Sequence, residues 1–240
     1  MPLILHIETT TRACSVGLSN NGKLLALRES LDRQYSHSST LTVFMEEVLV
    51  EAGKKPTDLQ AVAVSKGPGS YTGLRIGVSA AKGFCYALDI PLIAVDGLKA
   101  LTVVALQHFA KQEHCMPPAA VEARLCPMID ARRMEVYYCL LKCDLSQLQE
   151  TKAEVIDENT FKKLLQDYKV VFFGDGAAKC RAVVKSCNAL FIDDIWPSAS
   201  GMINEAEKKY AHKDFVNTAY FEPFYLKDFV AGKPKVKGLR

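Results

Sequence analysis

Small and polar residues fill the segment 66–73, Lys-Gly-Pro-Gly-Ser-Tyr-Thr-Gly, which lies between an apolar stretch and a predicted helix. Gly67, Gly69 and Ser70 stand in the turn itself. A glycine turn at the start of a helix gathers free backbone N–H groups at the positive end of the helix dipole, where an anion such as phosphate can bind. The same glycines can instead serve only the tight passage from strand to helix. The residues alone are compatible with both interpretations.

Histidine and cysteine, the side chains that most often bind zinc, are poorly spaced for a metal site. No two of the five histidines lie four residues apart, so no helix face presents a pair of them. The eight cysteines form no Cys-x-x-Cys pair, which is typical of free, buried thiols in a reducing compartment. We therefore expect no metal ion. His37, just before a predicted helix, is interpreted as a surface or capping residue.

Two predicted helices carry more apolar or closely approachable surface than one core-facing side requires. In the helix at residues 74–88, Gly73, Gly77 and Ala81 lie four apart, although each interior glycine costs about 1 kcal/mol relative to alanine. In the helix at residues 38–52, the apolar residues of one face are Leu41, Phe44, Met45 and Val48. The apolar residues off that face are Val43, Leu49 and Val50. Such helices need a close neighbour, either their own sheet or another chain.

Short apolar segments alternate with predicted helices, the pattern of an α/β protein with mixed sheets flanked by helices. The predicted strands are residues 3–7, 13–19, 23–29, 61–65, 92–95, 125–129, 134–142, 154–156, 170–173 and 190–192. Further helices are predicted at residues 97–112, 160–168, 177–187 and 200–212. An acid ends the first strand of two similar hairpins, Glu8 and Asp130, about half the chain apart. This echo indicates two related lobes that face each other across a cleft.

The expected organisation follows from these elements. Residues 1–112 form a first lobe, residues 113–214 a second lobe, and residues 215–230 an aromatic segment that packs back on the body. Residues 231–240 form a flexible basic tail with four positive charges and no acid. Because the net charge of the chain is only +3, the body itself is close to neutral, and charge alone gives no reason to expect nucleic-acid binding there. No apolar run is long enough for a membrane span, and no signal peptide is recognised.

Four segments together resemble the bacterial TsaB family, also called YeaZ. They are residues 4–18 with Glu8-Thr9-Thr10, the turn 67–75, the segment Ile129-Asp130-Ala131-Arg132, and residues 223–227, Pro-Phe-Tyr-Leu-Lys. The resemblance implies a two-lobed actin-like fold, related to ribonuclease H, Hsp70 and sugar kinases. It implies a non-catalytic subunit in the synthesis of threonylcarbamoyladenosine in tRNA, located in the cytoplasm. The partners it implies are a TsaD-type catalytic subunit and a TsaE-type ATPase, with tRNA bound through the complex and a homodimer when the subunit is alone.

The resemblance also implies that the helices at residues 38–52 and 74–88 form the contact surface. The expected interface residues are Leu41, Phe44, Met45, Val48, Leu74, Gly77, Val78 and Ala81. The alternative is that the sheet and the C-terminal segment bury both helices. In the catalytic relatives of this family two histidines four apart on a helix hold the metal, whereas the corresponding helix here carries only His108, with His114 six positions further on.

Members of this fold that bind nucleotide hold the phosphates between two hairpins, where an acid helps to hold magnesium. The matching residues are Glu8, Thr9, Thr10 and Asp130, together with Gly67, Gly69 and Ser70 of the turn. The first hairpin lacks the glycine of the kinases, because Arg12 and threonines fill it. We therefore expect no required cofactor, at most weak ATP or ADP with magnesium at the interface of the complex. Two alternatives stay open: an active ATPase or small-molecule kinase, and direct tRNA binding through the basic tail.

Overall fold

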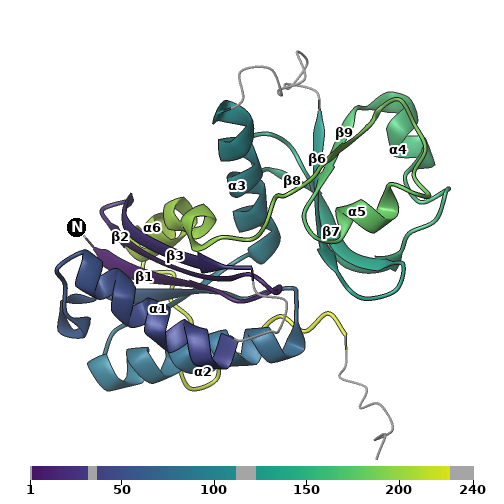
Figure 1. The fold of residues 1–240 in the computed structure, drawn as a ribbon. Coiled ribbons are helices and arrows are strands. Elements are labelled where there is room, and N and C mark those ends of the chain that lie inside the picture. Colours follow the sequence, from purple (N-terminus) through teal and green to yellow (C-terminus); the bar gives the residue numbers. More distant parts are fainter. Residues whose placement is uncertain (1, 32–36, 112–122, 228–240) are drawn as a thin grey trace, which may run out of the picture.

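The computed structural model describes residues 2–31, 37–111 and 123–227. Within them lie two five-stranded mixed sheets with helices packed on their faces (Figure 1). The first ten residues of the expected second lobe, His114 among them, and the expected tail at residues 231–240 lie outside the described residues. Over the part that the structure describes, no helix is both long and apolar enough to cross a membrane.

The first sheet has the strand order β3-β2-β1-β4-β5. Its strands are β1 (Leu3–Glu8), β2 (Cys14–Asn20), β3 (Lys23–Ser30), β4 (Ala61–Ser65) and β5 (Leu92–Val95). Strands β1, β2 and β3 pair antiparallel, whereas β4 and β5 continue the sheet in parallel with β1. The Asn21-Gly22 turn between β2 and β3 has positive φ at both residues, as a two-residue hairpin requires.

The second sheet repeats this topology, with the order β10-β9-β6-β7-β8. Its strands are β6 (Arg124–Asp130), β7 (Glu135–Leu141), β8 (Gln147–Val155), β9 (Val170–Phe173) and β10 (Ala189–Ile192). Strand β6 pairs antiparallel with β7 and parallel with β9, as β1 does with β2 and β4. Glu8 ends β1 and Asp130 ends β6, so the internal echo of the sequence is confirmed as a repeat of the fold.

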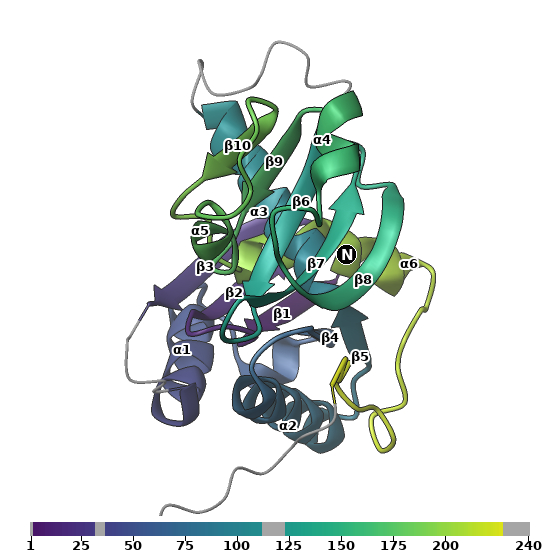
Figure 2. The ribbon, with the colours of Figure 1, turned by 90° about the vertical axis from the view of Figure 1, so that its right-hand side faces the viewer.

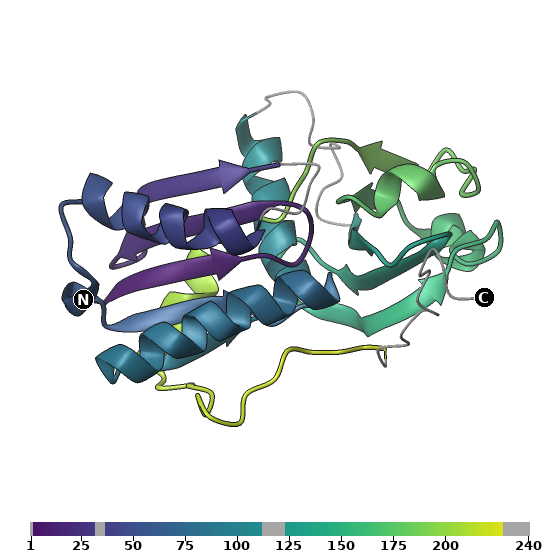
Figure 3. The ribbon, with the colours of Figure 1, turned by 60° about the horizontal axis from the view of Figure 1, so that its bottom comes forward.

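Helices α1 (His37–Glu51) and α2 (Tyr71–Leu88) lie side by side on one face of the first sheet (Figure 3). Helix α6 (Ile203–Ala211) and the short 3₁₀ helix η2 (Ala199–Met202) cover the other face. The second sheet carries α4 (Lys162–Asp167) and α5 (Ala177–Cys180), seen in green in Figure 2. A further 3₁₀ helix, η1 (Pro56–Asp58), precedes β4.

Helix α3 (Gly97–Lys111) stands between the two sheets (Figure 1). Leu98, Leu101 and Phe109 pack into a core with side chains of the second sheet, such as Phe173. Ala100, on another side of the helix, packs with residues of the first sheet and η2. A helix expected to belong to the first lobe thus contributes to the cores of both lobes.

Several predicted boundaries differ from the structure, three of them in ways that have a clear physical reason. The helix expected at residues 177–187 ends at Cys180, since the next turn carries Val184 into the core of the second lobe. The strand expected at residues 154–156 begins at Gln147, because β8 is a largely exposed edge strand without an apolar run to mark it. Helix α2 begins at Tyr71 instead of residue 74, with the Ser70 hydroxyl accepting a hydrogen bond from Gly73 N at 3.3 Å.

Glycines let α2 lie directly against the turn between β1 and β2. A Cβ at Gly73 would lie 2.1 Å from the carbonyl oxygen of Thr9, and a Cβ at Gly77 would lie 2.3 Å from Thr9 Oγ1. Gly83, two turns further on, has no neighbouring atom within 4 Å of such a Cβ. The glycines of one helix therefore differ in role: the first two permit packing, and the third is exposed.

We expect Gly77→Ala to destabilise the protein by about 1–3 kcal/mol, because the added methyl group must displace the Thr9 side chain. The matched variant Gly83→Ala should be neutral or stabilise by up to about 1 kcal/mol, since it removes backbone freedom from the unfolded chain without a clash. Urea denaturation of both variants measures the difference. Equal stability of the two variants would contradict the close packing described here.

Candidate functional site

The carboxyl group of Glu8 is buried where β1 ends. It is 0 % exposed, and its Oε1 accepts hydrogen bonds from Thr10 N at 2.6 Å and Thr10 Oγ1 at 2.5 Å. The Ser65 hydroxyl on the neighbouring strand lies near enough to favour the ionised form, yet falls short of hydrogen-bond geometry. Among the described residues, Glu8 Oε2 and Ser65 Oγ are thus left without a partner.

Burial raises the pKa of Glu8 above its ordinary value, and the hydrogen bonds from Thr10 only partly oppose this rise. His6, on the same side of β1, is also fully buried, and burial lowers its pKa to about 3. Its Nε2 lies 2.8 Å from Ser19 Oγ. Burial therefore disfavours a charge on both side chains, whereas a carboxylate that binds a metal ion must be ionised.

The turn that could cradle a phosphate is occupied by the chain itself. Ser70 N donates to the carbonyl oxygen of Thr10 at 2.6 Å, and Thr9 Oγ1 donates to the carbonyl oxygen of Gly73 at 2.8 Å. A Cβ at Gly69 would lie 2.3 Å from the Thr10 carbonyl oxygen. Gly67 has φ +103° and accepts from Gly97 N at 3.1 Å through its own carbonyl oxygen. The structure brings these predicted residues together, and their hydrogen bonds hold the turn against the first hairpin (residues 8–14).

The second hairpin (residues 130–135), unlike the first, has an exposed carboxylate in an ion pair. Lys179 Nζ forms an ion pair with the exposed Asp130 carboxylate and donates to the carbonyl oxygen of Glu135 at 2.6 Å. Asp130 N donates to Asp175 Oδ1 at 3.1 Å. Burial raises the pKa of Asp175 to about 6, and the charge of Asp130 adds to the rise. Glu8 and Asp130 occupy equivalent positions in the two sheets, but only Asp130 offers a solvent-exposed carboxylate.

Arg12 connects the two lobes. Its guanidinium carbon lies 4.4 Å from the centre of the Trp196 ring, and its charge partly opposes the rise that burial causes in the pKa of Asp175. The sequence shows that the first hairpin carries Arg12 instead of the glycine of the kinases. The partners of Arg12, Trp196 and Asp175, lie too far along the chain to be recognised from spacing. A bulky cation thus stands in the hairpin where a phosphate-binding backbone would need open access.

Histidine in this region supports packing. His37 was predicted to be a surface or capping residue, and this is wrong: its side chain is 2 % exposed, with Nε2 2.7 Å from the carbonyl oxygen of Thr11. Within residues 2–31, 37–111 and 123–227, no three His, Cys, Asp or Glu side chains lie close enough together to bind a metal ion. All the cysteines in these ranges are free, five of them are buried, and Cys187 is exposed.

The interface residues chosen from the sequence are the core-facing residues of α1 and α2. Six of them are at most 4 % exposed in the single chain, namely Leu41, Met45, Val48, Leu74, Val78 and Ala81. Gly77 is also buried, and Phe44 is partly buried against the same core. Most of this set is therefore inaccessible in the single chain, because the periodicity that selects a face of a helix also selects the face that meets the sheet.

The outward side of the same helices is exposed and either apolar or small. Val43 and Val50, two helical turns apart on α1, are 47 % and 70 % exposed. On α2, Gly83 and Ala87 are exposed, and Ile76 and Ala80 beside them are partly buried against the core of the first lobe. We call these six residues the outer face. The small size of Ala80 and Gly83 can be read from the sequence. The sequence does not show which side of α2 faces the sheet and which side faces solvent.

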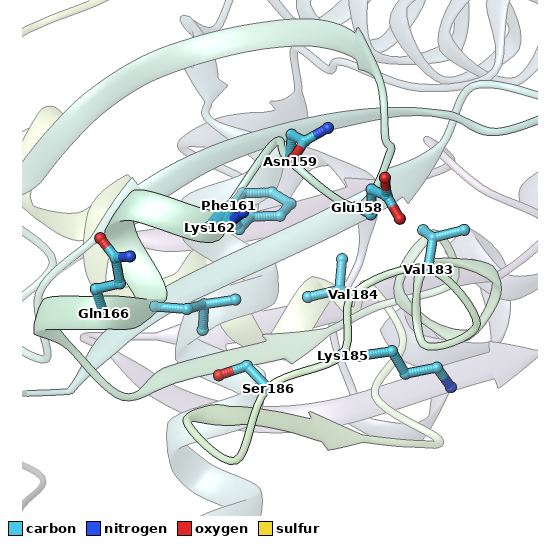
Figure 4. A pocket seen from close by; sticks show the side chains of 10 residues that line it. Glu158, Asn159, Phe161, Lys162, Gln166, Val183, Val184, Lys185 and Ser186 are labelled. Atoms are coloured by element: carbon cyan, nitrogen blue, oxygen red, sulfur yellow. The ribbon is translucent and has the colours of Figure 1, made fainter.

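Two cavities lie away from the turn at residues 67–73. One, of about 520 Å³, lies in the second lobe between α4 and residues 183–186 (Figure 4). Its floor includes Phe161 and Val184, and Lys162 and Glu158 lie on its rim. The other, of about 490 Å³, lies between β2, β3, α3 and Trp196. Neither cavity is lined by any residue predicted as a binding or interface residue.

We expect Glu8→Gln to gain stability over the original chain as the pH rises. The folded state raises the pKa of Glu8, so the stability of the original chain is complete below the ordinary carboxyl pKa and falls as the pH rises through the folded pKa. Glutamine keeps the acceptor for Thr10 and does not ionise. Urea unfolding at about pH 5 and about pH 8 measures this, with Glu46→Gln on the exposed side of α1 as control. A stability difference independent of pH would contradict a raised pKa of the buried Glu8.

Known proteins similar to this chain agree with the two-lobed architecture. YeaZ from Pseudomonas aeruginosa superposes with a TM-score of 0.73 at 23 % identity, covering 94 % of this chain and 100 % of that one. The TsaB protein of Escherichia coli strain K12, named a tRNA threonylcarbamoyladenosine biosynthesis protein, is 30 % identical, and the match covers 96 % of each chain. The protein of the same name from Haemophilus influenzae is 27 % identical over 96 % of this chain and 95 % of its own length.

The family model that matches residues 32–233 is described as TsaD, tRNA N6-adenosine threonylcarbamoyltransferase. This match spans both lobes, and the match to the Escherichia coli protein covers nearly the whole chain. The fold expected from the sequence, two-lobed and actin-like, is confirmed by the repeated sheets and by the YeaZ structure. The chain therefore belongs to the TsaB (YeaZ) family of tRNA threonylcarbamoyladenosine biosynthesis proteins.

Proposed function

We propose that this chain is a non-catalytic subunit of the tRNA threonylcarbamoyladenosine enzyme and acts by docking with a TsaD-type catalytic subunit. The observation that carries the proposal is the outer face of α1 and α2. The exposed side chains of Val43 and Val50 provide apolar surface. Gly83 has no side chain, so a second helix pair can approach α2 closely at this position. The core-facing side of both helices is already occupied by the first sheet, so docking uses the opposite side.

Helix pairs of this kind pack through ridges of side chains that fit into grooves, and small residues bring the helix axes together. Gly83 and Ala87 form such a groove on α2, and Val43 and Val50 form the adjoining ridge on α1. Because the two helices lie side by side (Figure 3), a partner with two similar helices would complete a four-helix contact. The same surface on a second copy would give a homodimer when the subunit is alone.

A docking role also suits the chemistry of the hairpins. The first hairpin uses its hydroxyl and amide donors internally, and its acid is buried. In this proposal the catalytic residues come from the partner, a TsaE-type ATPase joins the complex, and tRNA is bound through the complex as a whole. A cytoplasmic location follows from the tRNA substrate.

Gly83→Arg should weaken binding to the catalytic subunit at least about tenfold, or about 1.4 kcal/mol, because a long charged side chain would stand in the groove. The thermal midpoint of the free protein should change little, since a side chain at this position points into open space. Titration calorimetry with the purified TsaD-type subunit measures the affinity.

Gly83→Ala is the matched control and should bind like the original chain. Gly77 is unsuitable for this test, because a side chain there would disturb Thr9 and the fold itself. If the original chain and the catalytic subunit elute as two unshifted peaks in size-exclusion chromatography at micromolar concentration, the docking proposal is wrong.

We expect the isolated chain to bind Mg-ATP more weakly than about 10 μM, which corresponds to about −7 kcal/mol. The amide of Ser70 and the hydroxyl of Thr9 are already hydrogen-bonded within the chain, and Arg12 fills the hairpin. Calorimetry with ATP and magnesium tests this expectation. Tighter binding would favour the alternative function, an active ATPase or small-molecule kinase.

A further inference from the structure

Residues 215–227, here called the C-terminal strap, run from the end of the first lobe along α2 to the second lobe. Figure 3 shows the strap in yellow below α2. At its start, Val216 N donates to the carbonyl oxygen of Leu92 at 3.0 Å. Val216 and Phe221 pack against the core of the first lobe. The strap is thus part of the folded body at this end.

Helix α2 holds the middle of the strap along one flank. Lys82 Nζ donates to the carbonyl oxygens of Ala219 at 3.0 Å and Phe221 at 3.2 Å. These two bonds fix the backbone of the strap one turn before the exposed Tyr86. This flank adjoins the outer face and does not cover it.

The strap then reaches the turn at residues 67–73. Phe224 N donates to the carbonyl oxygen of Lys66 at 2.8 Å, and the Tyr225 and Tyr71 rings lie 5.2 Å apart. The guanidinium carbon of Arg75 lies 4.3 Å from the centre of the Tyr71 ring. The strap therefore fastens on the first lobe at three successive places: β5, the flank of α2, and the turn that begins α2.

On the second lobe the described part of the strap has a different kind of attachment, an ion pair between Lys227 and Glu135. Glu135 begins β7 and belongs to the second hairpin. Its carboxyl side chain is 19 % exposed and that of Lys227 is 44 % exposed, so solvent reaches this contact more easily than the packed anchors on the first lobe. Exposed ion pairs form and break at small cost.

We propose that the C-terminal strap is a latch between the lobes, in which Lys227 holds the second hairpin to the first lobe and releases it when the ion pair breaks. The three anchors on the first lobe fix the base of the latch, and the Lys227–Glu135 pair is its releasable end. Since Lys179 joins Asp130 to the backbone of Glu135, the whole hairpin moves with the residue that the latch holds. The latch thereby controls how closely the two hairpins approach each other.

Hydrogen exchange in the second hairpin tests the latch. Ala131 N donates to the Glu135 carbonyl oxygen and Glu135 N to the Arg132 carbonyl oxygen, both at 3.1 Å, so these amides report hairpin opening. Lys227→Ala and Glu135→Gln should each increase exchange of the peptide that contains residues 130–135 several-fold. Exchange in β1 and β4 should stay unchanged.

Lys209→Ala is the matched control, because Lys209 pairs with Asp214 just before the strap and that pair does not join the lobes. It should leave the second hairpin as in the original chain. The double variant Lys227→Glu with Glu135→Lys restores an ion pair of opposite polarity and should restore slow exchange. Unchanged exchange in both single variants, or no restoration in the charge swap, would overturn the latch.

Discussion

The contact between α2 and the first hairpin is the constraint on which the first lobe depends. Backbone atoms of Thr9 and Thr10 occupy the space that side chains at Gly69 and Gly73 would fill. The same contact uses the hydrogen-bonding groups that a phosphate would need, and it fixes the rotation of α2 about its axis. Once that rotation is set, Val78 and Ala81 must face the sheet, and Gly83 must face solvent. The packing of α2, the internal use of these hydrogen-bonding groups and the position of the outer face therefore have one physical origin.

The two lobes show how one topology can retain different chemistry. In the first sheet the acid that ends β1 is buried among hydroxyl and amide groups, and its pKa is raised. In the second sheet the equivalent acid, Asp130, is exposed and paired with Lys179. The positive charge of Arg12 in the first hairpin interacts with Asp175 in the second lobe. The two equivalent acids therefore differ in exposure and in their partners, although the topology around them is the same.

Much of the fold could be predicted from the sequence, because buried strands such as β4 and β9 are short apolar runs with clear ends. The repeat of Glu8 and Asp130 in the sequence also indicates two related lobes. The candidate interface could not be predicted in detail, since periodicity identified Leu41 and Val78 as one face without showing that the sheet already covered it. Burial of His37 depends on a carbonyl oxygen of the distant residue Thr11. The contact of Arg12 with Trp196 is likewise tertiary and leaves no local pattern.

The position of α3 bears on how this molecule comes together in the cell. Leu98 and Phe109 are interior residues of the second lobe, although their helix follows directly on β5 of the first. A nascent chain that ends after α3 would expose an apolar stripe that has nothing to cover it until β6 and β9 have been made. The two lobes therefore share α3, and a boundary drawn directly before or after this helix would divide a core to which it contributes.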